Sequence, residues 1–93
     1  MRLRMIVEHR LSDFARWKAV FDSHNEAQMD HGLTLEWLRQ DDADPDHIFF
    51  CLLVEDREKA EDFVNQPSSA EAAVESGVLE GSYCYVQDVD EAG

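Results

Sequence analysis

One stripe of residues between positions 14 and 31 combines aromatic rings with groups that can exchange protons. At the helical period of about 3.6 residues per turn, its six side chains share one face, which turns from apolar to polar halfway along. An imidazole beside an apolar pocket can accept a proton near neutral pH, so His24 is the candidate general base. The alternative is that the helix extends beyond the sheet and its last two turns are solvated. The stripe consists of Phe14, Trp17, Phe21, His24, Gln28 and His31.

The same stripe predicts a binding site for a small molecule. Ligand pockets are mostly apolar and contain a few placed polar groups. We expect Trp17, Phe21 and Gln28 to line such a pocket, together with Tyr83 and Tyr85 from one side of a later strand. The alternative for the two tyrosines is packing under a helix or at a subunit interface.

Other residue clusters do not predict a metal or cofactor site. His24 and His31 lie seven positions apart, about 10 Å along a helix, which is too far to ligate one ion. The aspartate-rich segment 41–46 is a turn rather than a calcium loop. Counting from Asp42, its sixth position is His47 instead of Gly and its twelfth is Leu53 instead of Glu. We therefore predict neither a metal nor a cofactor.

The pattern of apolar residues predicts the elements that position these side chains. Alternation indicates strands at about 3–10, 33–40, 47–54 and 81–89, with Leu33, Leu35 and Trp37 on one face of the second. Helical spacing predicts one helix over 13–30 and another that begins after Asp56 and is broken by Pro67 before a short continuation to Gly77. The tail 90–93 is predicted to be frayed.

This order, βαββαβ, is the ferredoxin-like α+β arrangement: a four-stranded antiparallel sheet with helices on one face. The strand 47–54 is apolar on both faces, so the open sheet face needs a cover. The simplest cover is a second copy, which gives a homodimeric α+β barrel. In this topology Cys51 and Cys84 lie about two strand spacings apart and form no disulfide. His9 and His47 lie at the ends of strands that should be neighbours, so a shared site is geometrically possible, but we expect both histidines at the surface.

Composition limits the remaining classes of function. A chain of 93 residues forms one domain, 1–93, because a division into two domains would leave each half with too small a hydrophobic core. The net charge of −13, from 21 acidic against 8 basic residues, repels phosphates and anionic headgroups, so we expect neither nucleic acid nor membrane as partner. No apolar run approaches the ~20 residues that cross a bilayer, and we expect a cytoplasmic protein.

Several segments resemble a known family, the dimeric α+β barrel proteins of the antibiotic biosynthesis monooxygenase type and their small relatives often labelled cyclases. The resemblance implies a homodimer, and for the oxygenase members a pocket between helix and sheet that takes polycyclic phenols. Trp17, Trp37 and Arg39 match the pocket residues of that family by type, and no catalytic residue is carried over. The matching segments are residues 9–14, 17–18, 21–22, 39–45 and 76–78.

Three functional hypotheses follow. The first is a dimeric module that binds a small apolar or aromatic molecule without catalysis, favoured because no nucleophile, base and orienting group occur together. The second is a cofactor-independent monooxygenase or cyclase acting on an aromatic or polyketide-like substrate, with His24 as the base. The third is a haem-associated protein that uses a histidine as the axial ligand.

Overall fold

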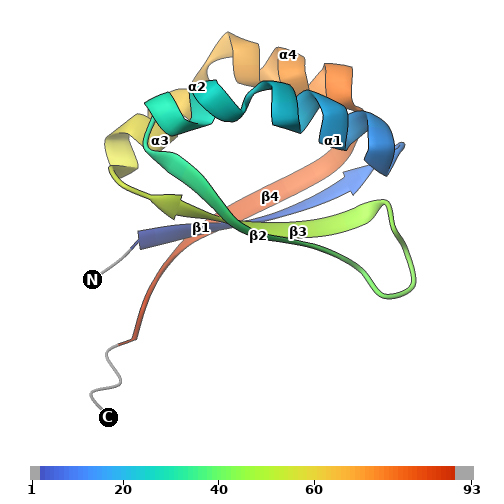
Figure 1. Cartoon of the computed structure of the whole chain (residues 1–93), viewed down its shortest axis with the longest axis horizontal. Coiled ribbons are helices and arrows are strands. Elements are labelled where there is room, and N and C mark those ends of the chain that lie inside the picture. The colour runs from blue at the N-terminus through green and yellow to red at the C-terminus, as the bar shows by residue number, and fades with distance from the viewer. Residues whose placement is uncertain (1–2, 90–93) are drawn as a thin grey trace.

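The computed structural model describes residues 3–89 as a sheet covered on one face by helices (Figure 1). The predicted frayed tail, 90–93, lies outside the described residues. All helices lie on the same side of the sheet, and its other side is bare in this chain (Figure 1). The elements are β1 (Leu3–Leu11), α1 (Phe14–Ser23), α2 (Asn25–Asp30), β2 (Leu33–Gln40), β3 (His47–Val54), α3 (Arg57–Asn65), α4 (Pro67–Ser76) and β4 (Val78–Gln87).

The strands form one antiparallel sheet in the order β2-β3-β1-β4, which confirms the predicted ferredoxin-like topology. Met5 of central β1 stands opposite Leu52 of β3 and Tyr85 of β4, and side chains of this parity face the helices. Trp17 of α1 and Ala60 of α3 close the core from above, at 3% and 0% exposure. Burial of these apolar side chains against one sheet face is the main source of stability.

A β-bulge in β2 overturns the predicted alternation of Leu33, Leu35 and Trp37. The register shifts between Leu35 and Trp37, so that Leu38 rather than Trp37 stands over the core, opposite Phe50. Trp37 pairs with Cys51 on the opposite sheet face. The extra residue of a bulge moves every later side chain of the strand to the opposite sheet face. A prediction based on strict alternation cannot detect this change.

The predicted helix 13–30 is divided in two at His24. This residue has φ −100° and ψ 7°, outside the helical values, and it caps both α1 and α2. The hydroxyl of the preceding Ser23 donates to the carbonyl of Val20 at 2.6 Å, a local bond that competes with regular helix geometry. Asp56 caps α3 as predicted, accepting from the amides of Glu58 and Lys59.

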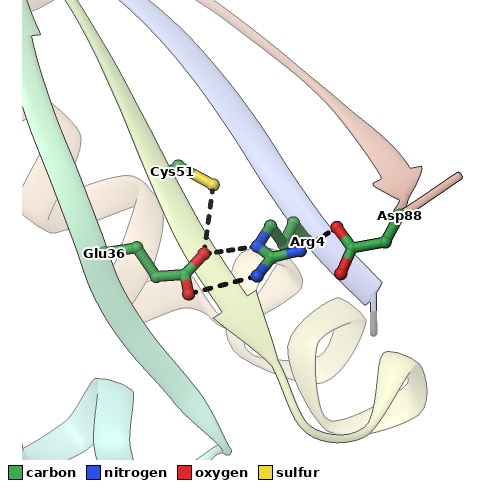
Figure 2. A network of polar contacts seen from close by, with 4 residues as sticks. All are labelled: Arg4, Glu36, Cys51 and Asp88. Atoms are coloured by element: carbon green, nitrogen blue, oxygen red, sulfur yellow. Dashed lines mark hydrogen bonds and ion pairs between the residues drawn. The ribbon is translucent and has the colours of Figure 1, made fainter. Parts of the chain in front are cut away.

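The bare side of the sheet, here called the open face, combines apolar side chains with an ionic network. Arg4 lies between Glu36 of β2 and Asp88 beyond β4, and the Cys51 thiol points to the same Glu36 carboxylate (Figure 2). The network therefore runs across the sheet from β2 through β3 and β1 to the residue that follows β4. Its carboxylates raise the pKa of Arg4, while burial and then Glu36 raise the pKa of Cys51. The apolar members of the open face are Ile6, Trp37, Phe49, Cys51, Leu53, Cys84 and Val86.

Cys51 and Cys84 are both free, and each stands opposite Ile6 from the two sides of β1. The predicted absence of a disulfide between them follows from this separation by one intervening strand. Within residues 3–89, no helix is long and apolar enough to span a bilayer.

Candidate functional site

The largest hollow described on the helix-covered side lies between the helices and the sheet and measures about 310 Å³. We call it the inner cavity. Its floor is formed by strand residues of the helix-facing parity and its roof by α1 to α4. This volume is at the lower end of the range for small-molecule sites. The lining consists of Met5, Val7, His9, Phe21, Gln28, Leu33, Phe50, Leu52, Phe63, Val64, Ser69, Ala70, Ala73 and Tyr83.

His9 lies in this cavity, and the expectation that it sits at the surface is wrong. It shares the parity of Met5 and Val7, and its ring packs edge-on against Phe50 at a centroid distance of 5.5 Å. Gly81 of β4 stands opposite and leaves the space: a Cβ there would lie 2.7 Å from Cδ2 of the imidazole. A glycine inside a strand often marks such a close approach.

Burial controls the protonation of His9. Desolvation lowers the pKa of His9 to about 4, so the ring is neutral at neutral pH. A neutral imidazole has one N–H donor and one bare nitrogen acceptor. Its Nδ1 is buried without a hydrogen-bond partner within residues 3–89.

Gln28 of α2 supplies a second unpartnered polar atom to the same cavity. The residue is 6% exposed, and its Oε1 has no hydrogen-bond partner in the described part of the chain. A buried amide oxygen without a partner costs about 1–3 kcal/mol, so most native structures avoid one. Both residues line the inner cavity, and because each atom is itself shielded in the free protein, a ligand reaches it only when the side chain turns toward the hollow.

A second hollow of about 140 Å³, here called the outer cavity, lies between the α1–α2 pair and the α3–α4 pair. Its lining is more polar because α4 presents hydroxyl groups to it. Phe21, Gln28, Phe63, Ser69 and Ala73 line both cavities, so the two adjoin. The residues that line the outer cavity alone are Trp17, Val20, His24, Ala27, Gln66, Ser68, Ala72 and Ser76.

The predicted site residues are distributed between these two cavities. Phe21 and Gln28 line both, whereas Trp17 and the candidate base His24 line only the outer one. Tyr83 lines the inner cavity, and Tyr85 lines neither. Four of the six stripe residues thus line these cavities, whereas Phe14 and His31 line neither, and the imidazole beside the larger hollow is that of His9 rather than His24.

Tyr83 stands at the edge of the inner cavity, where the cavity reaches the molecular surface. It is 43% exposed, and its hydroxyl donates to Glu61 of α3 at 3.4 Å. The Tyr85 hydroxyl donates to the same carboxylate, while Arg57 lies 4.5 Å above the Tyr85 ring. Partial burial, followed by the Glu61 charge, raises the pKa of both tyrosines. Both phenols therefore remain protonated, and of the two only Tyr83 contributes to the cavity lining.

The lining of both cavities is uncharged apart from its titratable histidine and tyrosine side chains. Within the described residues, neither lining includes Lys, Arg, Asp or Glu. No group of three or more His, Cys, Asp or Glu within residues 3–89 is arranged to hold a metal ion. The chemistry that these cavities offer is hydrogen bonding and apolar contact.

His47, the other strand-end histidine, lies on the open face, so it and His9 do not share a site. Its Nε2 lies 2.5 Å from the Glu8 carboxylate, and its ring packs beside Phe49 at a centroid distance of 4.7 Å. The His47 side chain is 12% exposed. Unlike His9, this histidine has its polar partner within the chain.

Sequence reasoning missed His9 because strand-end histidines usually face solvent. Two signals in the sequence indicate its position: its parity with Met5 and Val7, and the glycine in the last strand. The glycine has this meaning only once the strand register is known.

Comparisons with known proteins agree on the fold. No protein-family model matches the chain, and no curated protein matches it by sequence. Among solved structures, a candidate antibiotic biosynthesis monooxygenase from Bordetella bronchiseptica is 14% identical, with a TM-score of 0.77 over 95% of this chain and 97% of that one. A mutant of SnoaB, a cofactor-independent oxygenase from Streptomyces nogalater, is 10% identical, with a TM-score of 0.72 over 94% and 92%. The fold is therefore that of antibiotic biosynthesis monooxygenase-like proteins.

Proposed function

We propose that this protein binds a small, uncharged aromatic molecule bearing a hydroxyl group in the inner cavity. The observation that carries the proposal is the pair of buried, unpartnered atoms, His9 Nδ1 and Gln28 Oε1, on two residues that line a mainly apolar hollow. A hydroxyl can donate to Gln28 Oε1 once the amide turns toward it, and an aromatic ring fits among Phe21, Phe50 and Phe63. Binding then recovers hydrogen bonds that the free protein lacks.

Ligand binding accounts for the site better than catalysis by a general base. A base acting on a phenol must accept a proton from a group of pKa about 10. With a His9 pKa of about 4, that transfer is uphill by roughly 8 kcal/mol. A neutral imidazole at this position is suited to hydrogen bonding with the phenol rather than to ionising it.

A cofactor-independent monooxygenase is the second candidate, and the fold is what favours it. SnoaB, described as a cofactor-independent oxygenase, matches this chain with a TM-score of 0.72. A fold by itself does not assign an activity, and the identity to SnoaB is 10%. In this reading His24 is the remaining candidate base, acting from the outer cavity on the part of a substrate that reaches it.

We further propose that two copies associate through the open face, placing the ligand cavities on the outer sides of a homodimeric barrel. Ile6, Phe49 and Leu53 lie on this face with no helix of the same chain over them (Figure 1). A contiguous apolar sheet face of this kind normally meets a protein partner, and a second copy offers a matching surface. We expect such a dimer in the cytoplasm, without nucleic acid or membrane partners.

The test of ligand binding compares 2-naphthol with naphthalene, which has the same rings and no hydroxyl. Isothermal titration with the full chain is expected to show 2-naphthol binding about tenfold more tightly, the effect of one well-made hydrogen bond. Gln28→Leu removes the amide oxygen and should reduce this difference to within about twofold. Absence of 2-naphthol binding, or equal affinity for the two compounds in the unmodified protein, would refute the proposed function.

A further inference from the structure

The two cavities adjoin, and this arrangement restricts the shape of a ligand. They share Phe21, Gln28 and Ser69, so a molecule in the inner cavity can continue past the Gln28 amide into the outer one. The inner cavity is larger and mainly apolar, at about 310 Å³, whereas the outer one is smaller, at about 140 Å³. A ligand that fills both has its larger part in the inner cavity and a smaller group in the outer one.

The outer cavity is built to meet polar groups that carry no charge. Ser68, Ser69 and Ser76 face it from α4, and Gln66 faces it from the α3–α4 junction. Each of these serine hydroxyls already donates within the chain, to Gln66, Phe63 or Ala73, so toward a ligand the serine oxygens accept, which suits the O–H of an alcohol or the N–H of an amide. No cation within the described residues lines the cavity to receive a carboxylate or phosphate. The net charge of −13 adds a repulsive field against anions.

We propose that the ligand is a hydroxylated aromatic ring system carrying a neutral polar arm, with the rings in the inner cavity and the arm in the outer one. This inference rests on the proposed function and adds the class of compound. Gln28 Oε1, which is buried and unpartnered, lies at the boundary between the cavities and accepts from a hydroxyl or N–H where the arm leaves the rings. Anionic conjugates of the same rings are excluded.

The experiment uses three probes that share one ring system: 2-naphthol, 2-naphthol with a hydroxyethoxy group on the ring carbon next to the hydroxyl, and 2-naphthol with a carboxymethoxy group at the same place. We expect the hydroxyethoxy probe to bind the full chain about fivefold more tightly than 2-naphthol, the effect of about one further net hydrogen bond. The carboxymethoxy probe should bind more weakly than the hydroxyethoxy probe. The inference is overturned if the neutral arm gives no gain, or if the anionic arm binds as tightly as the neutral one.

A pair of variants on α4 assigns the gain to the outer cavity. Ala72→Met fills the outer cavity and leaves the inner lining intact, because Ala72 contributes to the outer cavity alone. The matched control is Val74→Met on the same helix, at a residue that is 77% exposed. Ala72→Met should abolish the advantage of the hydroxyethoxy probe and keep the affinity for 2-naphthol within about twofold, whereas Val74→Met should change neither.

The outcomes separate the two proposals. Binding of 2-naphthol with no gain from the arm overturns this inference and leaves the proposed function standing. A gain that persists in Ala72→Met places the arm elsewhere and also overturns the inference. If neither 2-naphthol nor its hydroxyethoxy derivative binds, the proposed function fails, and the inference fails with it.

Discussion

The polar side chains on the two faces of the sheet differ in whether they have partners within the chain. On the helix-covered face, His9 and Gln28 hold buried atoms with no partner in the described part of the chain. On the open face, Arg4 is bound by Glu36 and Asp88 (Figure 2), and His47 is bound by Glu8. An unpartnered buried group weakens the fold unless a ligand completes it, as we propose here, whereas paired charges around apolar residues are typical of a protein contact surface.

The two histidines show the difference most directly. They belong to neighbouring strands, and His47 stands opposite Arg10, the residue after His9. Successive strand residues face opposite sides of the sheet, so His9 lies in the apolar cavity, whereas His47, opposite the next position of β1, contacts the Glu8 carboxylate on the open face. The two faces can be tested separately, because a substitution on one parity leaves the other parity unchanged.

The largest expected effect comes from placing a charge at the centre of the open face. We expect a single chain, in which this face is uncovered, to tolerate Ile6→Glu, whereas in the proposed dimer the substitution would bury an unpaired carboxylate from each copy. We expect the dimer dissociation constant to rise by about a thousandfold or more, roughly 4 kcal/mol. Sedimentation velocity measures this change, with Val74→Glu, at a residue 77% exposed on α4, as the matched control.

The assignment of the open face fails if the unmodified protein sediments as a monomer of 10.7 kDa at micromolar concentration. It also fails if Val74→Glu dissociates the dimer as strongly as Ile6→Glu does. Either result would remove the difference between the two faces as contact surfaces.

The second effect is a pH dependence of stability caused by His9. The folded pKa of His9, about 4, lies below its usual value of 6.5, so between these pH values the unfolded chain binds more protons than the folded one. Stability contributed by the neutral ring is complete above pH 6.5 and is lost as the pH falls to about 4, by up to roughly 3 kcal/mol. Urea unfolding at a series of pH values should show the unmodified protein losing more stability than His9→Phe over this range. Parallel curves for the two proteins would contradict the buried, neutral imidazole.

The third effect is a gain in stability on removing the unpartnered amide of Gln28. Gln28→Leu keeps the volume roughly constant and replaces a buried polar group with an apolar one, so we expect the free energy of unfolding to increase by about 1 kcal/mol. Gln87→Leu, at an exposed residue of β4, is the control and should change stability by less than about 0.5 kcal/mol. Urea unfolding without ligand measures both. A loss of stability in Gln28→Leu would mean that its amide already has a partner in the protein.

The difference between the faces also explains which features the sequence could predict. The strand order and the single helical layer follow from hydrophobic periods of two and about 3.6 residues, and the stripe containing Phe21 and Gln28 does line the cavities. The bulge between Leu35 and Trp37 and the break at His24 involve single residues, so they leave the average period almost unchanged. His9 was missed because its environment depends on Gly81, more than seventy positions away, which the chain brings close only on folding.

The smallest expected effect is that of Gly81→Ala, which tests the close approach between Gly81 and the His9 ring. In a strand, Gly→Ala normally stabilises a protein by about 0.4–1 kcal/mol because the unfolded chain loses freedom. At Gly81 the new Cβ would lie 2.7 Å from Cδ2 of His9, so the imidazole must move within a packed cavity. We expect the gain to be cancelled and a net loss of about 0.5 kcal/mol in the free energy of unfolding, together with shifted NMR resonances of the His9 ring.

Ser82→Ala, at the next residue along β4 and on the open face, is the control and should leave the His9 resonances in place. If Gly81→Ala instead gave the full stabilisation with unchanged His9 resonances, the imidazole would not be seated against β4, and the cavity would lose one of its two polar contacts.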